Sequence, residues 1–438
     1  MSSNSLTESV FIPGKNWKLS LAELISFLEM KCAKAEVNES SKAFFVLSVS
    51  DPDLIDISVL GGMIKVGKLI AKLDTEKVKE AFLSGDKQRK IQVKKEISET
   101  GLVERMFERD FSRKSVFGVS VYWVDSAFRP VSKMLQRFVG STVKKLLAAE
   151  GKKVNFMGFA RERNYPQLTH VEVLKKKLIE SNADILFCVG KKNTFVSTTT
   201  AVHDPFEFQK RDVGKPCQRT IFAIPPRLAR IMINMATLQE GQVLLDPFCG
   251  VGTILQEGLL TGAKVVGMDI NKWCVDAAAR NLEWIKQEYS LENTNYRVVQ
   301  GDVCRLAEKI GRGQVDCIVT EPDLGPALRQ VPTGPYAQRI IEKLQPLYHI
   351  FLEESFKVLR KGGRLVLVSP HIKTRSGQQV SMRTGKKAAE LGFKPVFPFE
   401  RTVFTENNAA KEELTAMTSF IDSDERHKIG REISILQK

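Results

Sequence analysis

The segment 243–255, Val-Leu-Leu-Asp-Pro-Phe-Cys-Gly-Val-Gly-Thr-Ile-Leu, constrains the fold more than any other part of the chain. Its apolar start is typical of a buried strand. Gly250 and Gly252 predict a tight turn where a ligand can approach the main chain closely. Thr253 is placed to be the N-cap of a helix that follows. Strand, glycine turn and helix in this order indicate an open α/β sheet with a ligand crevice at the carboxyl ends of its strands.

Three further predicted strands, each followed by polar chemistry, support this interpretation. They are residues 264–269, which end in Asp269, residues 296–300, which precede Gly301 and Asp302, and residues 315–320, which precede Glu321. Asp269 lies about 20 residues beyond the glycine turn, the spacing that places a carboxylate on a ribose. A fifth strand is expected at 364–370, and segments 394–404 and 432–436 are expected to form an antiparallel hairpin at the sheet edge.

The motif Asp-Pro-Phe-Cys-Gly-x-Gly-Thr at 246–253 resembles the first motif of class I S-adenosylmethionine-dependent methyltransferases, in the branch that methylates exocyclic amino groups of bases. A nicotinamide or sugar-phosphate Rossmann domain is the alternative, but its fingerprint needs a third glycine that is missing here. The resemblance implies a doubly wound, seven-stranded Rossmann-like sheet and S-adenosyl-L-methionine as cofactor. Asp246 and the two glycines would surround the methionine part, Asp269 the ribose and Asp302 the adenine amino group. The full predicted cofactor-binding set is Asp246, Pro247, Gly250, Gly252, Thr253, Asp269, Ile270, Asp302 and Val303.

The amino-methylating families carry Asp/Asn-Pro-Pro-Tyr/Phe after the fourth strand, where this chain has Glu321, Pro322, Asp323 and Leu324. By the resemblance these four are the candidate catalytic residues. An acidic or amide oxygen and a proline carbonyl orient the amino group toward the sulfonium methyl, and a ring stacks on the flipped-out base. Glu321 keeps the carboxylate on a longer side chain. Leu324 replaces the ring and forfeits roughly 1–3 kcal/mol of stacking, for which Tyr336 is the nearest substitute.

The chain before this region predicts two smaller units. Residues 1–90 are expected to form a ferredoxin-like α+β domain, with Ser20 and Glu23 as a helix capping box. Residues 91–218, which include a linker, are rich in basic residues and resemble a THUMP domain, an RNA-binding module. Residues 219–438 would be the catalytic domain. Lysines and arginines clustered on one domain contact phosphates without reading sequence. The candidate RNA-binding residues are Lys144, Lys145, Lys152, Lys153, Arg161, Arg163, Lys175 and Lys176.

Two phrases between these units narrow the resemblance. Arg211-Asp-x-x-Lys215-Pro216 and the proline-led helix start at Pro225 resemble the segment that joins THUMP and catalytic domains in archaeal and eukaryotic tRNA guanosine-N2 methyltransferases of the guanosine-10 type. The resemblance implies an enzyme that methylates N2 of a tRNA guanosine. It implies tRNA as partner and leaves a small activating protein subunit open, because the eukaryotic relatives need one and the archaeal ones act alone.

Composition agrees with a nucleic-acid partner. The 438 residues carry a formal net charge of +15, which favours a polyanion, with simple solubility as the alternative. No stretch reaches the roughly 18 apolar residues of a membrane helix, so we expect a cytoplasmic protein without membrane contact. The 7 cysteines show no C-x-x-C pair and the 5 histidines no grouping, so no metal site is expected.

Two other functions remain open from the sequence. One is a DNA or other RNA amino-methyltransferase, and the THUMP-like unit argues against DNA. The other is a catalytically inactive, methyltransferase-like protein that binds RNA, because Asp323 and Leu324 depart from the family pattern.

Overall fold

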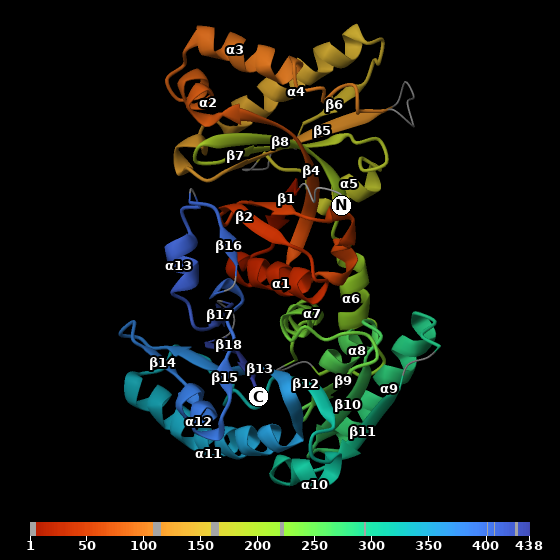
Figure 1. Cartoon of the computed structure of the whole chain (residues 1–438), viewed down its shortest axis with the longest axis vertical. Helices are drawn as coiled ribbons and strands as arrows, with labels where there is room; N and C mark the ends of the chain where they lie inside the picture. The colour runs from red at the N-terminus through yellow and green to blue at the C-terminus, as the bar shows by residue number, and fades with distance from the viewer. Residues whose placement is uncertain are drawn as a thin grey trace, which may run out of the picture.

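The computed structural model of the chain describes residues 6–107, 115–158, 166–219, 223–292, 295–400, 402–406, 408–424 and 428–438. Within these residues, two β-sheets lie one above the other along the long axis of the molecule (Figure 1). Helices α1 (Trp17–Met30) and α7 (Pro226–Met235) lie between the sheets.

A single nine-stranded sheet contains both N-terminal units, in the strand order β16-β2-β3-β1-β4-β8-β7-β5-β6. Its long strand β4 pairs antiparallel with β1 on one side and with β8 on the other. The boundary expected near residue 90 therefore divides two parts of one continuous sheet, and the division into domains stays a prediction. The strands are β1 (Thr7–Pro13), β2 (Ala35–Ser40), β3 (Phe45–Val49), β4 (Met63–Asp74), β5 (Val116–Trp123), β6 (Asn155–Met157), β7 (Asp184–Val189), β8 (Asn193–Val202) and β16 (Val403–Phe404).

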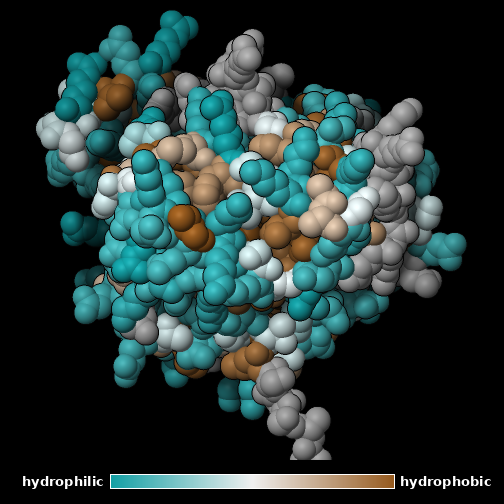
Figure 2. Space-filling view, turned by 90° about the horizontal axis from the view of Figure 1, so that it is seen from above, coloured by the Kyte–Doolittle hydropathy of each residue, from teal (hydrophilic) through white to brown (hydrophobic). Residues whose placement is uncertain are grey.

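Helices α2 (Thr75–Phe82), α3 (Lys87–Ser98) and α4 (Ser132–Ala149) cover the face of this sheet that points away from the rest of the molecule (Figure 1). Buried side chains of the three helices form one cluster with alternate residues of β5, β7 and β8, such as Val119, Phe187 and Val196. The surface at this end of the molecule is mostly hydrophilic (Figure 2). Helices α5 (His170–Lys175) and α6 (Pro205–Val213) lead from this part toward the second sheet.

The second sheet has seven strands side by side in the order β11-β10-β9-β12-β13-β18-β15. Strands β9 to β13 run parallel and β18 is antiparallel to β13. The predicted doubly wound, seven-stranded sheet is therefore confirmed. The strands are β9 (Val243–Asp246), β10 (Lys264–Asp269), β11 (Tyr296–Gln300), β12 (Val315–Thr320), β13 (Leu359–Lys373), β15 (Lys394–Pro395) and β18 (Ile429–Gln437), with β14 (Gln379–Ser381) and β17 (Phe420–Asp422) added on β13 and β18.

Alternation along the strands supplies both faces of this sheet. Leu244 and Val366 pack with α7, α8 (Thr253–Leu259) and α9 (Lys272–Glu288), whereas Leu245 and Leu365 pack with α11 (Gly334–Val358) and α12 (Thr384–Leu391). The remaining short helices are α10 (Leu306–Ile310), α13 (Lys411–Thr415) and the 3₁₀ turns Pro52–Leu54, Ile57–Val59, Ser126–Phe128, Val303–Arg305 and Pro398–Glu400.

The capping box predicted for Ser20 and Glu23 is wrong, and Glu23 instead joins the two halves of the molecule. Asn16, not Ser20, caps α1, because its side chain accepts a hydrogen bond from the Leu19 amide. Glu23 instead accepts from the amides of Gly61 and Gly62 at 2.7 Å and from the Asn234 side chain of α7 at 2.8 Å. A buried carboxylate with three donors thus ties α1 to the second half.

The expected edge hairpin forms only in part. Strand β15 pairs with β18 as predicted. Strand β16, from the same predicted segment, pairs parallel with β2 of the other sheet. The C-terminal part of the chain therefore contributes a strand to each sheet, a long-range pairing that local residue patterns do not encode.

Candidate active site

The predicted acidic residues meet at one edge of the second sheet. Strands β11, β10, β9 and β12 are neighbours in that order, and the carboxyl ends of parallel strands lie at the same edge. Asp246 ends β9, Asp269 ends β10, Asp302 follows β11 and Glu321 follows β12. The structure therefore brings together four carboxylates from positions up to 75 residues apart in the sequence.

The glycine turn opens the main chain to this edge. Gly250 has φ +51°, which side chains rarely adopt, and a Cβ there would find open space. Its amide donates to Asp269 Oδ2 at 2.9 Å, and the other oxygen of Asp269 accepts from the Asn271 amide at 2.8 Å. Asp269 is thus fixed beside the turn by two main-chain amides.

Thr253 is not the N-cap that we predicted. Gly252, with φ +86°, caps α8, and Thr253 is the first helical residue. The Thr253 hydroxyl accepts a hydrogen bond from Lys215 Nζ at 2.9 Å, and both residues are buried. Burial lowers the pKa of Lys215. Lys215 belongs to the Lys-Pro phrase of the linker. The sequence therefore indicated this residue as part of a family motif but did not predict its contact with Thr253.

Asp246 is almost fully buried beneath the turn. Its Oδ1 accepts from the Thr320 hydroxyl at 2.6 Å and from the Phe248 amide at 3.1 Å. Burial raises the pKa of this carboxyl to about 7, and the nearby charges of Asp269 and Glu321 act in the same direction. Thr320 is a further site residue that the sequence did not single out.

The remaining predicted cofactor residues divide by exposure. Ile270 is 67% exposed directly after β10, where an apolar side chain is available to cover a flat ring. Asp302 is exposed as well, and its carboxylate accepts from the Cys304 amide at 2.9 Å, a bond that lowers its pKa. Pro247 and Val303 are buried, so their side chains support the site from below.

Glu321 forms a bidentate ion pair with Arg431 of β18, at 2.5 Å from Nε to Oε2 and 3.2 Å from Nη2 to Oε1. The two side chains are only 8% and 15% exposed. A carboxylate offers about four lone-pair sites and the guanidinium takes two, so acceptor positions remain for an amino group. Arg431 lies 110 residues from Glu321, and no local pattern in the sequence indicates this partner.

The rest of the Glu-Pro-Asp-Leu segment is held by its own loop, by helix α11 and by the core. Pro322 is buried, and Asp323 is exposed and accepts from the Gly325 amide at 2.9 Å. The Tyr348 hydroxyl donates to the Asp323 carbonyl at 3.1 Å. Leu324 packs against the core. Tyr336, the expected substitute ring, is 41% exposed and has the Arg339 guanidinium over it at 5.7 Å.

The predicted RNA-binding residues lie on α4, α5 and their following loops. Lys144, Lys145, Lys153, Lys175 and Lys176 are exposed. Lys152 is engaged, because its Nζ donates to the Met106 carbonyl at 3.0 Å and pairs with Glu150 at 3.3 Å. Arg161 and Arg163 lie outside the described residues.

With this geometry in place, the family comparisons are specific. Residues 218–390 match the RMKL-like methyltransferase domain family. Residues 94–280 also match a DNA methylase family, and this matched segment ends before Glu321.

Named relatives agree with the first match. Over 163 residues the chain is 36% identical to a tRNA (guanine(10)-N2)-dimethyltransferase of Methanothermobacter thermautotrophicus, covering 36% of this chain and 43% of the relative. Over 141 residues it is 37% identical to the enzyme of that name from Methanocaldococcus jannaschii, covering 31% and 38%. The predicted resemblance to tRNA guanosine-N2 methyltransferases is confirmed. The matched segments span less than half the length of these relatives.

A solved structure shares the overall fold. TrmN from Thermus thermophilus superposes with a TM-score of 0.52 and 15% sequence identity, over 98% of this chain and 99% of that one. This likeness extends the fold to the N-terminal part, where the resemblance to a THUMP domain stays a prediction.

In the part of the chain that the structure describes, the helices are all too short or too polar to cross a membrane. In the same residues, no three His, Cys, Asp or Glu side chains gather in a way that could hold a metal ion.

Proposed function

We propose that this protein transfers a methyl group from S-adenosyl-L-methionine to the exocyclic N2 amino group of a tRNA guanosine. The observation that carries the proposal is Glu321 and Pro322 at the end of β12, beside a glycine turn with its own acidic residues. The names of the relatives supply the substrate class. Binding of tRNA through the basic N-terminal half follows from the same proposal.

The residues at the strand ends fit the cofactor. The open side of Gly250 and the fixed carboxylate of Asp269 suit an adenosine ribose. Ile270 and Asp302, both accessible, suit an adenine ring and its amino group. Asp246, buried below the turn, places a carboxyl near the methionine part. Bound here, the sulfonium supplies an activated methyl group.

Glu321 and the Pro322 carbonyl would each accept a hydrogen bond from the N2 amino group. These two bonds would turn the nitrogen lone pair toward the methyl carbon. S-adenosyl-L-methionine, when bound, would supply the methyl group and leave as S-adenosylhomocysteine, and N2 would release one proton to solvent water. Orientation dominates such a step, because holding reactants in a near-attack geometry removes much of the barrier. Arg431 holds the longer Glu321 side chain in one position.

Nucleoside mass spectrometry tests the proposal. Purified protein is incubated with S-adenosylmethionine and either unmodified tRNA transcripts or duplex DNA, and the digests are compared. N2-methylguanosine in tRNA, singly or doubly methylated, is the expected product. The match of residues 94–280 to a DNA methylase favours the second candidate, DNA amino-methylation, which predicts methyladenine or methylcytosine in the DNA digest instead.

The same assay tests whether the chain needs an activating subunit, and imaging tests its location in the cell. Full activity of the chain alone would show that no activating subunit is required, whereas activity only in cell extract would indicate one. We propose a cytoplasmic enzyme, and fluorescence imaging of a tagged chain tests that location.

A further inference from the structure

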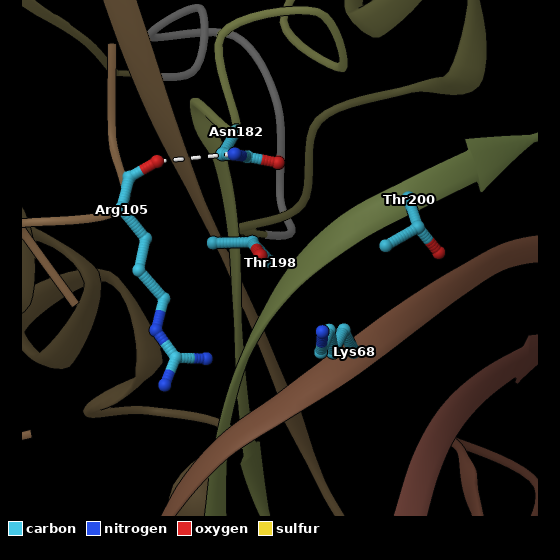
Figure 3. A pocket seen from close by; sticks show the side chains of 5 residues that line it. All are labelled: Lys68, Arg105, Asn182, Thr198 and Thr200. Carbon is cyan, nitrogen blue, oxygen red and sulfur yellow. Dashed lines mark hydrogen bonds between the residues drawn. The ribbon is translucent and has the colours of Figure 1, made fainter. Parts of the chain in front are cut away.

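A polar cavity of about 370 Å³ lies on the nine-stranded sheet (Figure 3), whereas the acidic crevice belongs to the seven-stranded sheet. It is lined by Lys68, Arg105, Asn182, Thr198 and Thr200. None of these residues belongs to the candidate active site or to the RNA-binding set predicted from the sequence. None of them is acidic.

The sheet and two loops build this cavity. Lys68 of β4 is directly opposite Thr198 of β8 in the antiparallel register, and Thr198 and Thr200, two residues apart, share a face. Arg105 and Asn182 come from the loops after α3 and before β7 (Figure 3). The Asn182 side chain donates to the Arg105 carbonyl at 3.0 Å, and the Phe107 amide donates to the Ser181 carbonyl at 2.9 Å. The two loops are therefore fixed to each other at the rim.

Two lining side chains have protein partners, because Thr200 donates to the Val66 carbonyl at 3.2 Å and Asn182 to the Arg105 carbonyl, but the other three have none among the described residues. Lys68 and Arg105 form no ion pair with any residue that the structure describes. Thr198 is only 5% exposed, and its hydroxyl makes no hydrogen bond within the described part of the chain. The hydroxyl oxygen itself reaches solvent, so it is accessible as a donor to a ligand in the cavity.

On the opposite face of the same strands, a buried lysine is neutralised by a carboxylate of the protein itself. Lys65 of β4 is fully buried and pairs with Asp184 at 2.7 Å, and that carboxylate also accepts from the Thr199 hydroxyl at 2.6 Å. Every charge there is compensated within the fold. Lys68, three residues further along β4, has no such carboxylate. The cavity therefore offers two uncompensated positive charges and a hydroxyl donor to an anion.

We propose that this cavity binds a backbone phosphate of the RNA substrate. Lysine supplies a point charge and arginine a planar pair of donors, and both suit phosphate oxygens. The site is open to solvent and larger than a single phosphate, as a passing phosphodiester chain requires. Such a contact positions the RNA without reading its sequence. The proposal rests on the proposed function for the identity of the RNA, and a free phosphate is the other source of the same chemistry.

Binding of an unmodified tRNA transcript to the full chain, followed by fluorescence anisotropy over a range of salt concentrations, tests the cavity. Lys68→Gln/Arg105→Gln should weaken binding about 10-fold and reduce the slope of log K against log salt by about 1 to 2, because each lost phosphate contact releases fewer counterions. Thr198→Val keeps the shape and charge, and should weaken binding about 3-fold at an unchanged slope. Arg312→Gln/Lys361→Gln, at exposed positions of the other half, removes the same charge and should leave affinity within about 2-fold.

Equal losses in the two double variants would overturn the proposal, since they would show a diffuse effect of net charge. An unchanged Thr198→Val affinity would also contradict it. Inorganic phosphate added at constant ionic strength distinguishes the sources. Competition with RNA at low millimolar concentration, absent in the Lys68→Gln/Arg105→Gln variant, would assign the cavity to free phosphate instead.

Catalysis separates this proposal from the proposed function. With tRNA, the Lys68→Gln/Arg105→Gln variant should show a KM raised about 10-fold and an unchanged kcat, with unchanged affinity for S-adenosylhomocysteine. A wild-type chain that binds RNA through the cavity but methylates nothing, alone or in cell extract, would refute the proposed enzyme activity and leave the cavity proposal intact. Methylation with an unaltered KM in the variant would refute the cavity alone.

Discussion

The crevice of the seven-stranded sheet and the cavity of the nine-stranded sheet carry opposite charges. The crevice gathers Asp246, Asp269, Asp302 and Glu321 from adjacent strand ends, whereas the cavity gathers Lys68 and Arg105 without a carboxylate. Acidic oxygens suit a cationic sulfonium and an amino group that donates hydrogen bonds. Basic side chains suit phosphates.

The two sites also differ in how their charges are held. In the crevice each carboxylate has a donor within the fold, such as the Gly250 amide for Asp269 and Arg431 for Glu321. In the cavity the cations have no such partner among the described residues. This difference is what we expect of a site that fixes a reacting group and a site that awaits a flexible polyanion.

The largest expected effect breaks the crevice at Glu321. Glu321→Ala should lower kcat for tRNA methylation by about 10²–10⁴-fold, because the amino group loses its orienting acceptor, with RNA affinity unchanged. Steady-state kinetics measure it. Thermal unfolding of Glu321→Ala/Arg431→Met, which leaves no unpaired charge, separates catalysis from stability. Wild-type kcat in the single variant would remove Glu321 from the mechanism.

A smaller effect is expected at the cofactor. Asp269→Ala should weaken binding of S-adenosylhomocysteine by about 10- to 100-fold, since charge-assisted hydrogen bonds contribute about 1.5–3 kcal/mol. Isothermal titration calorimetry measures the loss. Asp276→Ala removes a carboxylate of the same type that only pairs with Lys272 on the surface of α9, and should change the affinity little. Similar losses in both variants would contradict the assigned ribose contact.

A pH experiment sharpens the contrast at Asp246. Burial raises the pKa of this carboxyl to about 7, so it loses its proton between pH 6 and 8. A sulfonium cation favours the charged form. The preference for S-adenosylmethionine over S-adenosylhomocysteine should therefore rise roughly 3- to 10-fold over that range. Calorimetry with both ligands measures the ratio, and Asp246→Asn should make it independent of pH. A pH-dependent ratio in Asp246→Asn would assign the effect elsewhere.

The contribution of Asp246 to stability changes with pH in the opposite direction to its effect on cofactor binding. Because the folded pKa of Asp246 lies above its unfolded value near 3.9, this residue's contribution to the free energy of unfolding falls as pH rises from about 4 through 7. Asp246→Asn should flatten that part of the stability profile.

The smallest expected effect distinguishes a structural lysine from the predicted RNA-binding lysines. Lys152→Met should lower the free energy of unfolding by about 1 kcal/mol, because its ammonium holds the Met106 carbonyl. Lys153→Met, at an exposed neighbour, should leave it unchanged. Denaturant unfolding measures both. Equal stability of the two variants would return Lys152 to the RNA-binding set.

Much of the crevice could be predicted from the sequence, because strand, turn and acid follow one another locally. Strands β10, β11 and β12 begin and end where their patterns indicate. Thr253 was misplaced by one position, since Gly252 adopts the left-handed conformation that caps α8. Arg431 was missed because its partner is 110 residues away.

The nine-stranded sheet was harder to predict. Its pairing of β4 with β8 and of β16 with β2 joins distant segments, and residue patterns do not specify partners across such distances. Lysine density marked α4 and α5, but the cavity depends on Lys68 lying opposite Thr198 across two strands. The density of charged residues along the sequence therefore does not predict a cavity that forms only when two distant strands pair.

The central claim is that the crevice presents Glu321 to an exocyclic amino group. The most direct measurement uses a tRNA transcript in which inosine, which lacks that amino group, replaces the guanosine found to be methylated. Single-turnover transfer of labelled methyl from S-adenosylmethionine should vanish with this transcript while its binding affinity stays the same. Continued methylation at that position would contradict the account, because the acceptor would then be another atom.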